Sequence, residues 1–369
     1  MVFPDPNLEA YIRQHTGIET GPLSYSQVCT MDHLEESSAG ISDLSGVECL
    51  TGLTYISLWD NNISDLAPLA DLDHLVGLIV SDNSIASLDP LAAMSSLWLV
   101  GISDNPIASI EPLAGLPNLK ALLLGDNPVS DLSPLAEMTG LESLTIGPVP
   151  ATDFSPLTGL QSLVDLTLYG VAVSDTAPLS TLTALERLHL YDVPLDDASF
   201  VEPLSNLRSL VLTGTGLSDL SGISKLYSLY DMDASVNLVA ELPPLEDLQQ
   251  LRRFILDDNL ISDITPLGAL TNLEGLAVSG NQIVDISPVA SLAQLRWLAA
   301  EDNAIEDVSP LADLWFLEDV NLRGNLVTDI SPLVANPGIR GSAEEVCEES
   351  EGDKQRECWY EYHYDYVYL

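Results

Sequence analysis

Apolar residues recur at two spacings within one short stretch of the chain, LTYISLWDNNISDLAPLADLDHL, residues 53–75. At its start, Leu53, Ile56 and Leu58 predict the inward positions of a short strand that buries one face. The residues between them, such as Tyr55 and Trp59, are then expected to face outward. The second half of the stretch, SDLAPL, has the signature of a short helical turn. The stretch therefore predicts a strand followed by a turn of helix.

The whole pattern repeats with a period of 22 residues. Steps of 22 from Pro68 reach a proline each time as far as Pro332, apart from Phe200 and Gly222, and one step back reaches Gly46. About fourteen copies run from residue 31 to 340 without an inserted or deleted residue. A single globular core has no reason to keep such a register, so the sequence predicts a solenoid.

An asparagine closes the strand in most copies. Its side-chain amide donates and accepts hydrogen bonds at once, so a stack of asparagines satisfies buried backbone groups between coils. The column comprises Asn61, Asn83, Asn105, Asn127, Asn237, Asn259, Asn281, Asn303 and Asn325. Four copies carry Val149, Val171, Val193 and Thr215 instead, which leaves the loop geometry there open.

Each copy also carries Ser, Thr or Asp before Pro-Leu, as in Ser133-Pro134-Leu135. We expect the polar residue to be the N-cap and the proline to occupy the first helical position. Each copy therefore predicts about one turn of 3₁₀ or α-helix on the side opposite the strand.

The repeated pattern NxIxDLxPLxxLxxLxxLxL resembles the 22-residue leucine-rich repeat of internalin-type bacterial surface proteins, over about residues 3–340. The resemblance implies a curved α/β solenoid, a leucine-rich-repeat horseshoe with a parallel β-sheet on its concave side and short 3₁₀ or α turns on its convex side. It also implies export, and binding of a partner through variable outward positions, because members of the family bind unrelated partners that way.

The opening FPDPNLEAYIRQHTG resembles the helical N-terminal cap of the same family. Asp5 is placed to cap a helix that has Pro6 at its first position and Gly17 at its end. The residues that share one face of this helix are Leu8, Tyr11 and Ile12. We therefore expect a helical cap over residues 1–30, the solenoid over 31–340 and a C-terminal cap over 341–369.

The chain of 369 residues is strongly acidic, with 12 Lys and Arg against 56 Asp and Glu and a formal charge of −44. Such a surface repels nucleic acid and anionic membranes and favours cations, basic partners or a saline environment. The sequence has no apolar run of 18 residues, and MVFPDP lacks the basic and apolar regions of a signal peptide. We expect an extracellular or cell-surface protein whose export signal is missing from this sequence, with a cytosolic protein as the alternative.

Four cysteines lie in two pairs near the ends of the repeats. Cys29 lies one 22-residue step below Thr51, close to Cys49, and Cys347 and Cys358 flank an acidic loop. Neighbouring coils are only ~5 Å apart, so we expect the disulfides Cys29–Cys49 and Cys347–Cys358. Four reduced thiols are the alternative, and no Cys-x-x-Cys pattern indicates zinc.

The end of the chain, CWYEYHYDYVYL, predicts a strand with one aromatic face. Trp315 and Phe316 stand in the last repeats where an earlier copy has Thr271 and Asn272. Because a solenoid must cover its last coil, we expect the tyrosines to form a C-terminal cap over these two aromatic residues.

Two columns of acidic residues follow the repeat. The first comprises Asp43, Asp65, Asp131, Asp153, Asp175, Asp197, Asp219, Glu241, Asp263, Asp285, Asp307 and Asp329, and we expect these residues to cap local backbone N–H groups. The second comprises Asp60, Asp82, Asp104 and Asp126. It is the better calcium candidate, although it lacks the glycine spacing of a dedicated calcium loop.

Large outward residues gather in the middle and C-terminal parts of the predicted sheet, whereas small residues such as Ser81 and Gly125 leave the remainder smooth. Exposed Trp, Tyr and Arg residues anchor interfaces, so this face is the predicted partner-binding site. Its candidate residues are Tyr169, Arg187, His189, Tyr191, Asp231, Asp233, Arg253, Asp257, Trp297, Glu301 and Arg323. The alternative is that an open sheet face simply tolerates aromatic residues, an explanation we apply to Tyr55 and Trp59.

The five histidines are scattered, and no Ser/His/Asp or Cys/His set shares a neighbourhood by register. We therefore predict a binding module without enzymatic activity or cofactor, which recognises either a protein, with basic proteins included, or a surface glycan. The alternatives are a cytosolic regulatory scaffold and a structural surface protein without a discrete ligand. The oligomeric state stays open.

Overall fold

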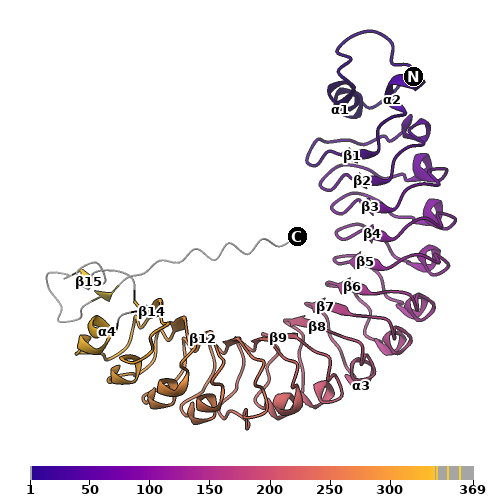
Figure 1. Ribbon diagram of the computed structural model, residues 1–369. Helices are drawn as coiled ribbons and strands as arrows, with labels where there is room; N and C mark the ends of the chain where they lie inside the picture. The colour runs from indigo at the N-terminus through magenta and orange to yellow at the C-terminus, as the bar shows by residue number, and fades with distance from the viewer. Residues whose placement is uncertain (1, 337, 340–346, 349–356, 359–369) are drawn as a thin grey trace. The chain divides into compact units, whose positions relative to one another are not determined.

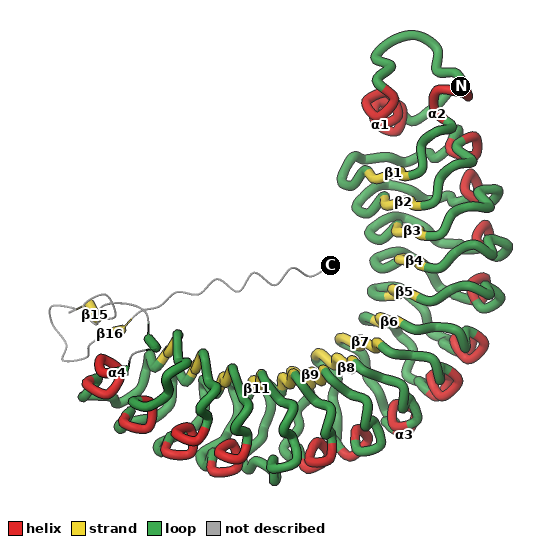
Figure 2. Tube along the Cα trace, in the orientation of Figure 1, coloured by secondary structure: helices red, strands yellow, loops and turns green. Residues whose placement is uncertain are grey.

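The computed structural model describes residues 2–336, 338–339, 347–348 and 357–358. The chain divides into two compact units, Met1–Leu188 and His189–Leu369. Fourteen described strands, β1 to β14, follow one another in sequence order in the sheet. Within each unit the strands lie along one side of the coils and the short helices along the other (Figures 1 and 2). The predicted leucine-rich-repeat fold is confirmed.

The first unit begins with two helices and continues in regular coils. The helices are α1 (Pro6–Thr16), α2 (Tyr25–Val28) and α3 (Ala177–Ser180). The strands are β1 (His33–Glu35), β2 (Tyr55–Ser57), β3 (Gly77–Ile79), β4 (Leu99–Gly101), β5 (Ala121–Leu124), β6 (Ser143–Ile146) and β7 (Asp165–Tyr169). Between the strands lie 3₁₀ helices at Val47–Cys49, Ala67–Leu69, Asp89–Leu91, Glu111–Leu113, Ser133–Glu137 and Ser155–Gly159.

Strand β8 (Arg187–Tyr191) contains the point at which the two units divide. The second unit continues with β9 (Ser209–Thr213), β10 (Asp231–Asp233), β11 (Arg253–Ile255), β12 (Gly275–Ala277), β13 (Trp297–Ala299), β14 (Asp319–Asn321), the helix α4 (Ser331–Ala335) and the antiparallel pair β15 (Cys347–Glu348) and β16 (Glu357–Cys358). Its 3₁₀ helices are Ser199–Val201, Ser221–Lys225, Thr265–Ala269, Ser287–Ser291 and Ser309–Leu311.

The strands pair in parallel at the predicted offset of 22 residues. In the first unit Ile56 pairs with Leu78, and in the second unit Phe254 pairs with Leu276. The inward residues of β1 to β13 and the leucine, isoleucine or valine residues of the 3₁₀ helices are buried, so each of these coils stacks its apolar interior on the next. Because the interior is continuous along the coils, each unit is stabilised by contacts between neighbouring repeats.

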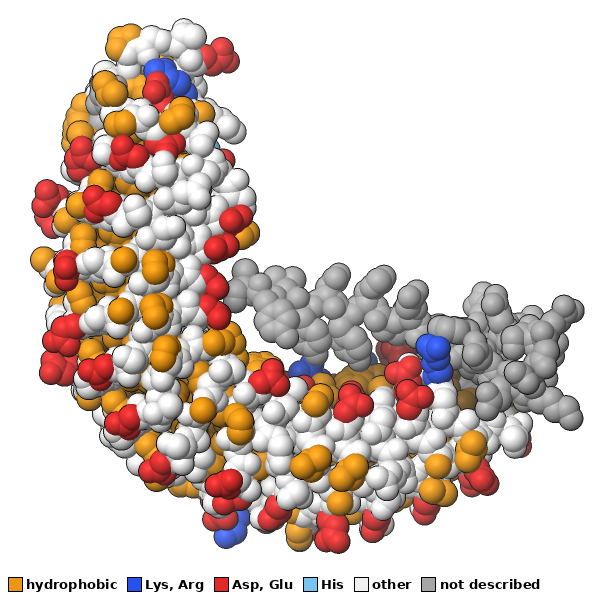
Figure 3. All heavy atoms as spheres, turned by 180° about the vertical axis from the view of Figure 1, so that it is seen from behind, with side chains coloured by type: hydrophobic (Ala, Val, Ile, Leu, Met, Phe, Trp, Pro, Cys, Tyr) orange, Lys and Arg blue, Asp and Glu red, His pale blue; other side chains and the backbone are white. Residues whose placement is uncertain are grey.

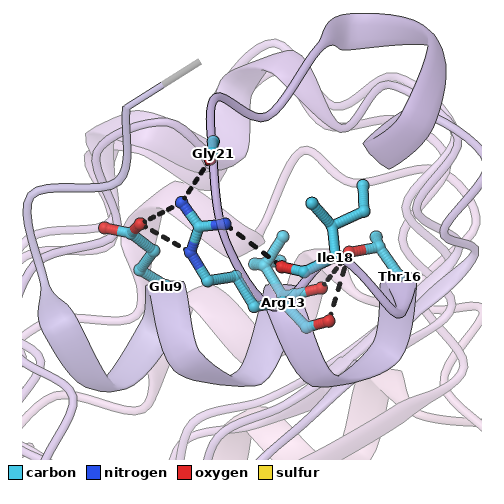
Figure 4. A network of polar contacts seen from close by, with 6 residues as sticks. Glu9, Arg13, Thr16, Ile18 and Gly21 are labelled. Carbon is cyan, nitrogen blue, oxygen red and sulfur yellow. Dashed lines mark hydrogen bonds and ion pairs between the residues drawn. The ribbon is translucent and has the colours of Figure 1, made fainter.

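The N-terminal helix forms as predicted. The Asp5 side chain accepts hydrogen bonds from the N–H groups of Asn7 and Leu8, and Gly17 ends α1 in the left-handed conformation. Arg13 holds the next segment against the helix: its guanidinium pairs with Glu9 at 2.7 Å and donates to the Ile18 and Gly21 carbonyls (Figure 4).

The asparagine column forms the predicted ladder between coils. Asn105 is buried, its Oδ1 accepts the Ile85 N–H at 2.9 Å, and its Nδ2 donates to Val80 O at 3.0 Å on the preceding coil. Nδ2 also donates to the Ile102 and Ser103 carbonyls of its own coil. The amide therefore satisfies backbone groups on two coils at once, as the sequence predicted.

Three of the copies without the asparagine have strands of five residues, β7, β8 and β9. In the first unit β7 has five residues where β2 to β4 have three, and in the second unit β9 has five where β10 has three. The Leu195 N–H, which an asparagine oxygen accepts in other copies, bonds to the Thr215 carbonyl instead. The missing side-chain acceptor is thus replaced by main-chain pairing.

The expected N-cap role of the residue before Pro-Leu is wrong. Ser133 is the first residue of its 3₁₀ helix, Leu132 precedes it, and no side chain caps from that position. The cap comes from the first acidic column instead: Asp131 Oδ1 accepts the Ser133 N–H at 2.8 Å. The same bond recurs at Asp43, Asp65, Asp153, Asp175, Asp197, Asp219, Asp263, Asp285, Asp307 and Asp329, which confirms the predicted capping there.

Candidate partner-binding face

The open face of each unit is the solvent side of its strands, opposite the buried leucines. Within a strand, residues such as Tyr55 and Ser57 are partly exposed while Ile56 between them is buried. The residue just before the strand also points outward. Trp98 and Leu99 both donate their N–H groups to the Val76 carbonyl, so two residues of one coil stand opposite one residue of the other, as at a β-bulge. The alternation of inward and outward side chains therefore shifts by one position before the strand begins.

This extra outward position was missed in the sequence analysis. It is occupied by Val76 and Trp98 in the first unit, with 44% and 47% of each residue exposed, and by Tyr230 in the second, with 55% exposed. The signal was present in the sequence, because the inward residues Leu53 and Ile56 are three apart and leave two outward residues between them.

Glycines on the open face leave room for aromatic rings from neighbouring coils. A Cβ built on Gly77 would clash with the Tyr55 ring, and one built on Gly275 would clash with the Trp297 indole. Tyr169 covers two glycines in the same way, Gly125 and Gly147. The rings therefore lie flat along the sheet, where packing restricts their motion before any partner binds.

Tyr169 is also held by its hydroxyl group, which donates to Asp126 Oδ2 at 3.3 Å. Burial, followed by the Asp126 charge and this hydrogen bond, raises the pKa of Tyr169 to about 12. The phenol therefore stays protonated at neutral pH and remains a hydrogen-bond donor. Arg187, the other predicted site residue of the first unit, pairs through Nε with Asp165 Oδ2 at 2.8 Å.

In the second unit, ion pairs join side chains one coil apart. Arg253 pairs twice with Asp231, with Nε to Oδ1 at 2.6 Å and the second nitrogen to Oδ2 at 3.2 Å. Arg296 lies between Glu274 and Glu318 at 3.9 and 3.6 Å. Exposed pairs of this kind contribute little to stability, but they fix the orientation of the guanidinium groups.

Asp257 lies half-buried on the same face. Burial raises its pKa to about 6, and the neighbouring Asp233 and Asp258 carboxylates act in the same direction. The Ser279 N–H donates to Asp257 Oδ1 at 2.6 Å and opposes the shift. Asp233 Oδ1 accepts the Ser235 N–H. Ionised Asp257 therefore carries a desolvation cost that a cationic side chain of a partner would reduce.

The remaining predicted site residues lie on the open face of the second unit. His189 Nε2 lies 3.0 Å from the Ser209 hydroxyl, and its ring meets the Tyr191 ring edge-on at 6.2 Å between centroids. Glu301 is partly exposed, and its N–H donates to the Ser279 hydroxyl, while Arg323 is exposed after β14. Within the second unit the structure thus brings the predicted residues onto one face.

Two shallow grooves lie at the start of the first unit, where no site was predicted. One, of about 580 Å³, is lined by Tyr11, His15, Thr16, Gln27, Thr30, Met31, Asp32, His33 and Glu35. The other, of about 390 Å³, is lined by His33, Thr54, Tyr55, Val76, Gly77, Trp98 and Leu99. His33 belongs to both, so the grooves adjoin.

The calcium candidates have a backbone role. Asp60, Asp82, Asp104 and Asp126 all have positive φ, between 49° and 55°. This is the left-handed region, which aspartate tolerates better than most residues. Burial and the Asp126 and Asp82 charges raise the pKa of Asp104. In the described part of the chain, no group of three or more His, Cys, Asp or Glu side chains is arranged to hold a metal ion.

The predicted disulfide between Cys29 and Cys49 is not formed, because both residues carry free thiols. The Cys29 carbonyl lies against Gly52 on the next coil. Cys49 is the last residue of a 3₁₀ helix and donates its N–H to the Gly46 carbonyl. Cys29 is the residue that caps the end of α2, so the two cysteines end separate helical segments, and no bond joins the two sulfur atoms.

The strands that contain Cys347 and Cys358 pair with these two residues opposite each other, although their side chains are outside the description. The tyrosine-rich segment 359–369 lies outside the described residues, so the predicted C-terminal cap stays a prediction. Trp315 and Phe316, which it was expected to cover, have 69% and 51% exposure. No helix in the described ranges is both long and apolar enough to cross a membrane.

Comparisons with known proteins agree with this fold. A family model described as leucine-rich repeats in two copies matches residues 249–291, and no curated protein matches. The solved structure of the internalin InlF from Listeria monocytogenes is 28% identical, with 93% of this chain and 96% of that chain covered and a TM-score of 0.72.

Two more solved structures are similar in fold. The functional domain of InlJ from Listeria monocytogenes is 22% identical, with 90% of this chain and 73% of that chain covered and a TM-score of 0.72. A leucine-rich-repeat protein from Leptospira interrogans is 20% identical, with 84% and 89% covered and a TM-score of 0.66. The resemblance to internalin-type leucine-rich-repeat proteins is confirmed.

Proposed function

We propose that this internalin-like leucine-rich-repeat chain is a non-enzymatic, exported binding module that recognises another protein through the open face of its strands. The observation that carries the proposal is the pre-organised set of aromatic and charged side chains on that face. Rings lie flat over glycines, as Trp297 does over Gly275, and guanidinium groups are held by carboxylates one coil away, as Arg253 is by Asp231. Side chains fixed in this way lose little conformational entropy on binding.

The charge of the chain restricts the class of partner. Figure 3 shows acidic side chains scattered over the surface in view, with few basic ones. At a formal charge of −44, association with a basic or neutral partner is favoured over association with an acidic one. In the second unit, five of the six described basic residues belong to the strands or the positions beside them: Arg208, Arg252, Arg253, Arg296 and Arg323. Basic side chains are thus concentrated where the proposed interface lies.

The test uses a partner captured from the native surroundings with this chain as bait and then purified. Replacing Trp297 or Tyr191 by Ala is expected to weaken its binding by about 5- to 150-fold, the range of 1–3 kcal/mol typical of interface anchors. Tyr227 is the control, because it is 54% exposed but lies in the turn after the 3₁₀ helix Ser221–Lys225. Tyr169 is left out because it belongs to the first unit, whereas this test addresses the second.

Equal affinities in Trp297→Ala, Tyr191→Ala and Tyr227→Ala would exclude the open face of the second unit as the interface. Export is tested separately, by locating the protein in fractions of the native cell. Recovery from the cytosol alone would favour the regulatory scaffold instead.

A further inference from the structure

The two adjoining grooves of the first unit differ in chemistry. The groove over β2 to β4 is largely apolar, with Val76, Trp98 and Leu99 standing beside the Tyr55 ring. The groove between the N-terminal helices and β1 is polar, and its lining includes the carboxylates of Asp32 and Glu35. Figure 1 shows β1 to β4 side by side, with α1 and α2 beyond β1. An occupant of both grooves therefore meets an apolar strip at one end and acidic groups at the other.

The apolar strip is rigid and offers side chains rather than backbone. The N–H groups of Trp98 and Leu99 bond to the Val76 carbonyl, and those of Lys120 and Ala121 bond to the Trp98 carbonyl. Because the main chain of these coils is already paired, an occupant has no backbone ladder to extend here. Binding in this groove depends on side-chain contacts with residues whose positions are fixed by the coil register.

Charge is distributed unequally along the strip. Lys120 follows Trp98 on the next coil, but its Nζ lies 2.9 Å from Glu142 Oε1, so its charge is compensated. At the opposite end Asp32 has a side chain 75% exposed, 3.0 Å from His33, and Glu35 lies nearby in the same groove. Among the residues that the structure describes, no Lys or Arg lines either groove. The charge along the two grooves is therefore mainly acidic and lies at the β1 end, where His33 pairs with Asp32 only when the imidazole is protonated.

The coil spacing sets the length of a matching occupant. Coils are stacked ~4.8 Å apart, so Asp32 and Val76 are separated by about 10 Å, and Asp32 and Trp98 by about 14 Å. An extended peptide advances ~3.3 Å per residue, so these spans correspond to roughly three and four residues.

We propose that these grooves bind an extended segment of a partner protein in which Lys or Arg lies three or four residues from an aromatic or aliphatic side chain. The cation pairs with Asp32 and Glu35, and the apolar side chain packs against Val76 and Trp98 beside the Tyr55 ring. The proposal deepens the proposed function by adding a peptide site in the first unit, and it rests on that function only for its biological role.

The experiment selects a random 12-residue peptide library displayed on phage against the whole chain. Enriched peptides are then synthesised with a fluorescent label, and their affinities are measured by fluorescence anisotropy. The expected peptides carry Lys or Arg three or four residues from Trp, Phe, Leu or Ile. Trp98→Ala is expected to weaken their binding at least tenfold, as truncation of an anchor residue does.

Matched variants separate the two halves of the site. The double variant Asp32→Asn, Glu35→Gln is expected to weaken binding severalfold and to remove most of its dependence on salt. Trp59→Ala is the control, since Trp59 is 48% exposed in the same unit but lines neither groove, and it is expected to leave affinity unchanged within twofold. Val76→Ser provides a second, smaller truncation of the apolar half, and thermal melting checks that each variant is folded.

A library that yields no binder, peptides without the basic-apolar spacing, or unchanged affinity in Trp98→Ala would each overturn the peptide site. None of these outcomes affects the proposed function, whose test uses a captured partner and Trp297. Conversely, peptide binding that depends on Trp98 supports the site even if Trp297→Ala leaves a captured partner bound.

Discussion

Replacing Asn105 by Ala should destabilise the first unit through one orphaned backbone group. Asn105 has only 4% of its surface exposed, and its Oδ1 is the acceptor for the Ile85 N–H at 2.9 Å. The three carbonyls to which Asn105 Nδ2 donates each keep another donor after the substitution. The Val80 carbonyl still accepts from Asn83 Nδ2, and the Ile102 carbonyl from Asn127 Nδ2. The Ser103 carbonyl still accepts from the Asp82 N–H. The Ile85 N–H has no such substitute.

The size of the effect follows from that difference. A buried donor left without a partner costs about 1–3 kcal/mol, and loss of the remaining hydrogen bonds adds roughly 1 kcal/mol, because their acceptors stay paired. We therefore expect Asn105→Ala to lower the free energy of unfolding by about 2–4 kcal/mol. Asn118→Ala is the matched control: Asn118 is exposed and makes one side-chain bond, to the Ser95 carbonyl, so its loss should cost roughly 0.5 kcal/mol or less.

Hydrogen exchange read by mass spectrometry suits this measurement, because long repeat arrays need not unfold in one step. Peptides that cover residues 80–107 should lose protection in Asn105→Ala, with the amide of Ile85 most affected, while urea unfolding gives the overall change. The reasoning fails if Asn105→Ala costs no more than Asn118→Ala, or if the loss of protection is spread evenly over the unit.

Three further predictions concern other features of the coils. Because burial raises the pKa of Asp257 to about 6, its ionisation lowers the free energy of unfolding as pH rises from about 4 to 6. A pKa shift of about two units corresponds to roughly 3 kcal/mol of unfolding free energy, which partial exposure reduces to about 1–2 kcal/mol. Asp257→Asn keeps an acceptor for the Ser279 N–H and should remove this loss in urea titrations between about pH 4 and 7. Val236 has a φ of 57°, which is unfavourable for a β-branched residue. Val236→Asn should therefore raise the free energy of unfolding by roughly 0.5–1.5 kcal/mol. A decrease would show that the valine side chain contributes packing energy. Asp131→Ala removes the cap on Ser133 and should increase hydrogen exchange in that 3₁₀ helix, whereas unchanged exchange would mean that water replaces the carboxylate.

The repeat architecture was predictable because each coil repeats the same physical problem. A strand must bury alternate residues and a turn must pair its backbone, so Leu53, Ile56 and Asn61 recur at fixed places. The helical cap was predictable for a similar reason, since Asp5 and Gly17 act locally on α1. Local preferences and the 22-residue period agree here, and such agreement makes a fold readable from sequence.

The site was less predictable because it depends on side chains one coil apart. Arg253 and Asp231 are 22 residues apart, so their ion pair was implicit in the register, yet we expected both side chains to be available to a partner. Trp98 was overlooked because the bulge-like pairing before β4 adds an outward position that strict alternation does not provide. The expected Cys29–Cys49 bridge rested on coil spacing alone, whereas the two residues end separate helical segments, α2 and the 3₁₀ helix Val47–Cys49.

The flat packing of rings over glycines was also missed. Gly125 was interpreted as part of a smooth floor, whereas a Cβ on it would meet the Tyr169 ring; Gly77, Gly147 and Gly275 lie against a Tyr or Trp ring from the neighbouring strand in the same way. The sequence signal is an aromatic residue 22 positions after a glycine for two of them, as in Gly147 with Tyr169 and Gly275 with Trp297. Gly77 shows the reverse order, with Tyr55 on the preceding coil.

Hydroxyl-radical footprinting of the complex with a captured partner tests the central claim most directly, because Trp and Tyr side chains on the strands and in the turns are labelled in one experiment. If the partner binds the open face, labelling of Tyr191, Tyr230 and Trp297 falls on complex formation, while Tyr227, in the turn after a 3₁₀ helix, reacts as in the unbound chain. Protection of Tyr227 with unchanged labelling of Trp297 would contradict the account.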